Sequence, residues 1–228
     1  MRTLMTAAAL AATLSGIAAA QTRTYPPLSA YLMPRSAEIA MAESAAPANI
    51  STAATIKVLT TSGFEVARTG SNGFVCTVMR GWSAPTYTPK DFRDFVFDAT
   101  LRAPICFDAV ASRTVLPYYE MRTRLGMAGK TPDQITEAVG IAYASGQLPK
   151  REPVSFAYMW AADQLLGPGI GAWHPHLMVF IPYYDNASLG GNEFGHGLPQ
   201  LSDDAGTPFA VVVIPVDHAL FIHSPGVR

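Results

Sequence analysis

Two adjacent segments with strong helix signals, between residues 117 and 146, most constrain how this chain can fold. The first starts at Pro117, a residue suited to a first helical position, and ends at Gly129, a typical helix cap. The second starts with the capping box Thr131-Pro132-Asp133-Gln134 and ends at Gly146. Because the link between them is very short, the two segments predict an αα-hairpin.

Each segment also has an apolar stripe at helical spacing, which predicts the face that packs on the rest of the protein. The first stripe is formed by Tyr118, Met121, Leu125 and Ala128. The second is formed by Ile135, Ala138, Val139 and Ala142. We expect these residues to form the buried side of the hairpin.

Short β-prone runs lie on both sides of this helix pair. Before it come Thr55–Thr60, Phe64–Arg68 and Gly73–Arg80, and the short glycine-containing links between them are typical of β-hairpins. After it come residues 154–160, 176–181 and 209–216. The last two runs are apolar on both alternating faces, which predicts central strands covered on both sides of a sheet.

The order of these elements predicts the fold class. Ser36 would cap an N-terminal helix over Ala37–Ala46. In residues 154–160 large apolar side chains alternate with smaller ones, and we expect Tyr158 and Trp160 to lie in the core. Together the elements predict an α+β fold. We expect a mixed or mostly antiparallel sheet of about five to six strands, with the αα-hairpin and one N-terminal helix packed on it.

The first twenty residues have the three parts of a secretory signal peptide. Arg2 gives a positive start, Met5–Ile17 is apolar and rich in alanine, and Ala18–Ala20 offers the small residues that a signal peptidase accepts. This apolar run is too short to span a bilayer, which takes about 20 residues, and no later run is long enough. The sequence therefore predicts an exported protein, periplasmic or secreted, with no membrane span in the mature chain. The predicted organisation is a signal peptide at 1–20, an extended arm at 21–34 and a single globular domain at 35–228.

Cys76 and Cys106 are the two cysteines of the chain. Disulfides persist where exported proteins work, and an even count favours pairing, although two buried free thiols are the alternative. A bridge would close a loop of about 30 residues and stabilise the fold by roughly 3–4 kcal/mol in the chain-entropy model. In an extended run Phe74, Cys76 and Val78 share one face, which would direct Cys76 inward. We expect a Cys76–Cys106 disulfide.

The segment between the cysteines contains several prolines and aromatic residues. We expect Trp82–Pro104 to be a long surface loop that the disulfide holds at both ends, and a candidate lid or binding loop. Tyr183-Tyr184 follows the end of a predicted strand and is a candidate surface for stacking a ligand. Asp203-Asp204 is more typical of a solvated turn than of an acid–base pair.

Composition excludes one class of partner. Charged residues make up 14% of the chain and apolar residues 49%, which indicates a well-buried core rather than disorder. Removal of the leader with Arg2 changes the formal charge from −1 to −2, and the remaining cations are scattered. Nucleic-acid binding needs clustered cations, so we expect no nucleic-acid partner, and instead a small-molecule or protein ligand.

All five histidines lie between residues 174 and 223, and Trp173-His174-Pro175-His176 brings two of them together. In an extended segment residues two apart point the same way, so His174 and His176 could face one metal ion, with zinc the metal that such ligands favour. A third ligand would come from Glu193, His196 or His218. A His-x-His pair without a third ligand at diagnostic spacing is a weak signal, and histidines at strand ends more often form local hydrogen bonds.

Four stretches of the chain resemble the sequences of uncharacterised bacterial exported proteins that share a Trp-His-Pro-His-Leu-Met motif. The matching stretches are Gly73-Phe74-Val75-Cys76, Pro104-Ile105-Cys106-Phe107, Arg113-Thr114-Val115-Leu116-Pro117 and Trp173-His174-Pro175-His176-Leu177-Met178. The resemblance spans most of the mature chain and implies a periplasmic or secreted bacterial protein. It carries no activity, cofactor or site residue to this chain.

Two functions remain open at this point. The first is a non-catalytic exported protein that binds a ligand or partner through the 82–104 segment and the C-terminal aromatic region. The second is a metal-dependent hydrolase that uses His174 and His176. The sequence has no Gly-x-Ser-x-Gly elbow, no His-Glu-x-x-His motif, no P-loop and no Rossmann glycine pattern, so no other enzyme class is indicated.

Overall fold

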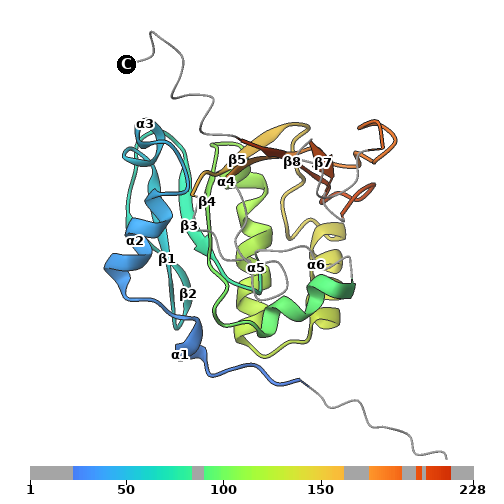
Figure 1. Cartoon of the computed structure of the whole chain (residues 1–228). Helices are drawn as coiled ribbons and strands as arrows, with labels where there is room; N and C mark the ends of the chain where they lie inside the picture. Colours follow the sequence, from blue (N-terminus) through green and yellow to red (C-terminus); the bar gives the residue numbers. More distant parts are fainter. Residues whose placement is uncertain (1–22, 84–89, 162–174, 192–198, 202–203, 217–228) are drawn as a thin grey trace, which may run out of the picture.

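The computed structural model describes residues 23–83, 90–161, 175–191, 199–201 and 204–216 (Figure 1). The predicted signal peptide lies outside the described residues. The strands are β1 (Thr55–Thr60), β2 (Gly63–Arg68), β3 (Val75–Met79), β4 (Ala103–Phe107), β5 (Ser155–Met159), β6 (His176–Phe180), β7 (Gln200–Leu201) and β8 (Val211–Pro215). The helices are α1 (Leu28–Tyr31), α2 (Arg35–Glu43), α3 (Ala48–Ser51), η1 (Lys90–Phe97), α4 (Ala111–Thr114), α5 (Leu116–Met127) and α6 (Pro132–Ala144). None of the helices in this part of the chain is long and apolar enough to cross a membrane.

The described strands form one mostly antiparallel sheet, which confirms the predicted α+β class. Its order is β2-β1-β3-β4-β5-β6-β8-β7, and only β1 and β3 pair in parallel. The sheet has eight strands rather than five to six, because β4 and the two-residue β7 were not predicted.

The parallel pairing of β1 and β3 corrects the second predicted hairpin. β2 returns antiparallel to β1, but residues 69–74 then cross the start of β1, so that β3 runs beside β1 in the same direction. Backbone N–H groups of Ser71 and Asn72 both donate to the carbonyl of Ala53 in this crossing. Gly70 lies so close to that backbone that a Cβ atom would be 2.2 Å from the carbonyl carbon of Ala54. The glycines of this link therefore serve a close crossing and not a tight hairpin turn.

Two apolar clusters lie on opposite faces of the sheet. Helix α2 covers one face, where Ala42 packs with Val58, Cys76 and Val78. Helices α5 and α6 cover the other, with α5 between the sheet and α6 (Figure 1). Helix α2 begins at Arg35 after Pro34 and has no side-chain cap, so the predicted Ser36 cap is wrong.

The αα-hairpin is confirmed, including its capping box. The Thr131 Oγ1 accepts from the Gln134 N–H at 3.3 Å, and the Gln134 Oε1 accepts from the Thr131 N–H at 3.1 Å. The buried face of α5 differs from the predicted stripe, because Tyr119, Arg122 and Thr123 are buried and Ala128 is exposed. Helix α5 therefore directs a charged residue into the protein.

The Cys76–Cys106 disulfide is present and joins directly opposed residues of β3 and β4. The segment between the cysteines is not the predicted surface loop. Trp82 is buried and its ring stacks on Tyr31 at 3.9 Å between centroids. Val96 and Leu101 are also buried, while residues 84–89 lie outside the described residues. Tyr31 belongs to α1, so part of the predicted extended arm at 21–34 is helical and packs into the core.

The side chains of strand β5 face the opposite sides of the sheet from those predicted. Its small residues Ser155 and Ala157 are buried on the α5 side, whereas Phe156 is 42% exposed on the other. Phe107 and Phe180 fill the space beside these small residues, so there is no room for another large ring. Tyr158 is only partly buried, against Phe74 on the α2 side.

Candidate functional site

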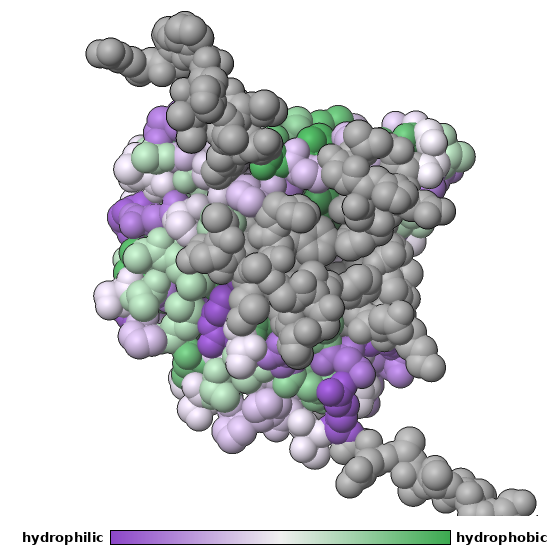
Figure 2. Space-filling view, in the orientation of Figure 1, coloured by the Kyte–Doolittle hydropathy of each residue, from purple (hydrophilic) through white to green (hydrophobic). Residues whose placement is uncertain are grey.

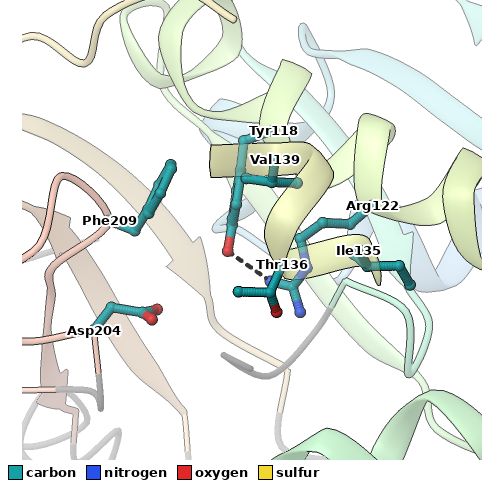
Figure 3. A pocket seen from close by; sticks show the side chains of 7 residues that line it. All are labelled: Tyr118, Arg122, Ile135, Thr136, Val139, Asp204 and Phe209. Carbon is teal, nitrogen blue, oxygen red and sulfur yellow. Dashed lines mark hydrogen bonds between the residues drawn. The ribbon is translucent and has the colours of Figure 1, made fainter. Parts of the chain in front are cut away.

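A cavity lies between α5, α6 and the turn that precedes β8 (Figure 3). Its volume is about 50 Å³ and it is partly open to solvent. A water molecule takes about 30 Å³ in the liquid, so the cavity suits only one or two small polar groups of a ligand. It is lined by Tyr118, Arg122, Ile135, Thr136, Val139, Asp204 and Phe209.

The aromatic wall of the cavity joins α5 to the turn before β8. The rings of Tyr118 and Phe209 stack with centroids 4.7 Å apart and an interplanar angle of 18°. Tyr143 of α6 meets Phe209 edge-on at 5.3 Å. Contacts of this kind contribute about 0.5–1.5 kcal/mol each beyond area burial, so they hold the turn against the helix pair.

Arg122 lies one helical turn after Tyr118 and is 1% exposed. Its Nη1 donates to the Tyr118 hydroxyl oxygen at 3.0 Å, as the dashed line in Figure 3 shows. Burial raises the pKa of Tyr118 above its ordinary value, although the charges of Arg122 and Arg151 oppose that shift. The hydroxyl therefore keeps its proton at neutral pH. Because its oxygen accepts from Arg122, the O–H is free to donate to another acceptor.

Arg151, in the link between α6 and β5, is also buried at 8% exposed. Within the described part of the chain none of its three guanidinium nitrogens has a hydrogen-bond partner. Its Cζ lies 5.0 Å from the ring centroids of both Tyr118 and Phe209. Those two centroids are 4.7 Å apart, so the three points form a nearly equilateral triangle beside the cavity. A third ring, Phe180, lies 5.5 Å away.

These ring contacts offset only part of the cost of burying the Arg151 charge. A desolvated cation–π contact contributes about 2 kcal/mol. An isolated buried charge costs more, since removing one partner of a buried ion pair destabilises proteins by about 3–5 kcal/mol. The Arg151 guanidinium is thus a strong donor group that an added anion would stabilise.

Asp204 brings one negative charge to the cavity. The residue is 7% exposed, and Figure 3 shows its carboxylate directed across the cavity from the side opposite Arg122. The turn that places it is well connected. Thr207 donates to the Asp204 carbonyl through its Oγ1 at 2.6 Å, and the Phe209 N–H donates to the same Oγ1 at 3.1 Å. The predicted solvated turn is therefore wrong for Asp204, and Asp203 lies outside the described residues.

The same turn is tied to the predicted stacking pair. The Tyr183 N–H donates to the Thr207 carbonyl at 2.8 Å, and the Gly206 N–H donates to the Tyr184 carbonyl at 2.7 Å. Tyr183 has a positive φ of 64° and is 62% exposed, whereas Tyr184 is partly buried. The backbone of this pair supports the turn, and only Tyr183 presents an exposed ring.

The histidine prediction falls mostly outside the described residues. His176 is the first residue of β6 and is 4% exposed, on the same side of the strand as the core residues Met178 and Phe180. His174, Glu193, His196 and His218 are not among the described residues. Among the residues that are, no three His, Cys, Asp or Glu side chains gather as metal ligands. The zinc site stays a prediction.

Neither Arg122, which lines the cavity, nor Arg151, which lies beside its aromatic wall, was predicted from the sequence. The Tyr118 and Arg122 spacing of one helical turn was visible, but it is equally common on solvated helix faces. Arg151 follows Lys150 in a polar link, and nothing in that link indicates burial. On the molecular face in Figure 2, polar and apolar residues of the described part are interspersed.

No family model, curated protein or solved structure matches this chain. The resemblance to exported bacterial proteins with a Trp-His-Pro-His-Leu-Met motif therefore stays a prediction. A function for the chain has to follow from the chemistry of its own cavity.

Proposed function

We propose that this chain is an exported binding protein whose cavity between α5, α6 and the 204–209 turn takes the oxyanion of a small ligand, with a carboxylate as the preferred group. The observation that carries the proposal is the Arg151 guanidinium, which is buried and has three donor nitrogens without hydrogen-bond partners in the described chain. A carboxylate at the cavity would neutralise this charge where ring contacts alone do not.

The other charged and polar groups support an anion rather than a cation. Arg122 and Arg151 provide two positive charges near the cavity, against one negative charge from Asp204. Guanidinium groups stay protonated and match carboxylate and phosphate geometry. The Tyr118 O–H adds a neutral donor.

The size and lining of the cavity favour a carboxylate. A volume of about 50 Å³ suits a planar group of three atoms better than a tetrahedral phosphate with its hydration. Ile135 and Val139 form an apolar wall, which excludes water and strengthens charge-assisted hydrogen bonds.

Export is supported by the leader pattern together with the disulfide. Cys76 and Cys106 are bridged and buried between two neighbouring strands, as suits an oxidising compartment. Intact mass and N-terminal sequence of the protein secreted by a bacterial host test this part. A mature chain that begins at Gln21 supports it, and a chain that keeps residues 1–20 in the cytoplasm contradicts it.

Calorimetric titration of the mature protein with acetate, propionate and inorganic phosphate tests the binding function. We expect both carboxylates to bind and to raise Tm, with phosphate at least about tenfold weaker. Arg151→Met should abolish this binding, because methionine keeps the apolar stem and removes the charge. Lys150→Met is the matched control, since Lys150 is the exposed neighbour and carries the same charge.

A second pair of variants separates the cavity from the surface of α5. Arg122→Met should weaken binding about tenfold or more, as expected for loss of a charge-assisted hydrogen bond. Arg124→Met should not, because Arg124 is exposed on the same helix. Equal binding by wild type and Arg151→Met would overturn the proposal. If phosphate binds more tightly than both carboxylates, the cavity is a phosphate site and the carboxylate preference is wrong.

A further inference from the structure

We infer that the ligand of this cavity carries an ammonium group close to its carboxylate, as an α-amino acid does. The inference rests on the proposed oxyanion site and concerns the opposite side of the same cavity. The residue that carries it is Asp204, whose side chain lines the cavity across from Arg122.

The first step is the placement of unlike charges around one small space. Arg122 and Tyr118 come from α5, and Arg151 lies beside the Tyr118 and Phe209 rings. Asp204 comes from the turn before β8, with the cavity between it and α5 (Figure 3). A site built for an anion alone would not direct a carboxylate into the same space, because like charges repel at short range.

The second step is that Asp204 is held in place by the fold. Its carbonyl accepts two hydrogen bonds from Thr207, one from the N–H at 3.1 Å and one from the Oγ1 at 2.6 Å. The turn is fixed further by the stacking of Phe209 on Tyr118. The backbone that carries the Asp204 side chain is therefore fixed, so less conformational entropy is lost when the carboxylate binds a ligand group.

The size of the cavity limits the distance between the two charged groups of the ligand. The cavity holds about 50 Å³, so a negative and a positive ligand group that are both bound there must lie only a few bonds apart. In an α-amino acid one carbon separates the carboxylate from the ammonium group. The carboxylate would face Arg122 and the Tyr118 O–H, with the Arg151 charge beside the Tyr118 ring, and the ammonium group would donate to Asp204. The ligand side chain would leave through the open side of the cavity.

Three probes that differ in one group test the inference with the mature wild-type protein. L-alanine has both charges, propionate lacks the ammonium group, and N-acetyl-L-alanine has an uncharged amide in its place. We expect L-alanine to bind at least about tenfold more tightly than the other two, as one charge-assisted hydrogen bond supplies. These titrations need no variant, so they stand even if a substitution impairs folding.

The variant Asp204→Asn tests whether Asp204 causes the preference for L-alanine over propionate. The variant should lose the preference for L-alanine and bind propionate at least as well as wild type, because the repelling charge is removed. Glu137→Gln is the matched control, since Glu137 is exposed on α6 next to the cavity residue Thr136, and it should keep the preference.

The outcomes separate this inference from the proposed function. If propionate binds and L-alanine binds no more tightly, the oxyanion site stands and the amino-acid inference is overturned. The same holds if Asp204→Asn keeps the preference, because Asp204 would then only balance the arginine charges. If none of the three probes binds, both the oxyanion site and the amino-acid inference are overturned.

Discussion

Replacement of Arg151 by methionine should make the ligand-free protein more stable. The guanidinium is 8% exposed and its three nitrogens have no hydrogen-bond partner in the described chain. An isolated buried charge costs about 3–5 kcal/mol, and the desolvated ring contacts return about 2 kcal/mol. Methionine has a similar shape, fills the same space and keeps favourable contacts with aromatic rings. We therefore expect the free energy of unfolding to rise by about 2 kcal/mol.

Urea unfolding followed by tryptophan fluorescence, in Tris chloride without carboxylates or phosphate, measures this difference. For a protein of this size about 2 kcal/mol corresponds to a Tm increase of about 4–8 °C. Lys150→Met should stay within about 0.5 kcal/mol of wild type, as substitutions of exposed residues usually do. Added propionate should reduce the difference in unfolding free energy between Arg151→Met and wild type, because it stabilises only the protein that retains Arg151.

A loss of more than about 1 kcal/mol in Arg151→Met would refute the reasoning. It would mean that the guanidinium is already well compensated in the folded chain and that its burial is structural. The cavity would then have no unmet positive charge, and the proposed function would lose the observation that carries it.

Four other predictions concern the fold, the pH response and the metal hypothesis. Joint replacement of Cys76 and Cys106 by alanine should lower the free energy of unfolding by roughly 3–4 kcal/mol in urea titrations, and an unchanged midpoint would contradict a stabilising bridge. Gly70→Ala should cost about 2–4 kcal/mol in the same assay, because its Cβ would lie 2.2 Å from backbone carbon, and a neutral effect would contradict the crossing geometry. Burial raises the pKa of Tyr118, so unfolded tyrosine releases its proton near pH 10 while the folded residue keeps it. Stability should therefore be independent of this group below pH 10 and fall above it, as unfolding curves between pH 8 and 11 would show. If the predicted zinc site exists, untagged protein should contain near-stoichiometric metal and His176→Ala should lose it, whereas metal-free protein of unchanged stability would exclude the site.

Elements with strong local signals were predictable from the sequence. The Thr131 capping box and the Gly129 and Gly146 caps placed the αα-hairpin, because these signals act within a few residues of the chain. β1 was predicted with its observed bounds, since its β-prone run is short and clearly ended. The disulfide was predicted from the leader-like pattern of residues 1–20 and an even cysteine count, which both require no knowledge of the fold.

The candidate site was not predictable, because burial of a charge is a property of packing. Arg122 differs from the exposed Arg124 by only two positions on α5, and what separates them is the face that meets α6 and the 204–209 turn. The predicted orientation of β5 was wrong for a similar reason. Ala157 faces inward because Phe107 and Phe180, from neighbouring strands, already fill that side.

The sequence by itself predicted helices α2, α5 and α6, six of the eight described strands and the disulfide, because hydrophobic period, capping and turn chemistry act locally. Only the tertiary structure decided that β3 runs parallel to β1, that Arg122 and Arg151 are buried, and that Asp204 lies across a small cavity from Arg122. These features depend on contacts between segments far apart in the chain, such as Tyr118 with Phe209. Local preferences carry no information about such contacts, so the chemistry of the site emerged only with the packed structure.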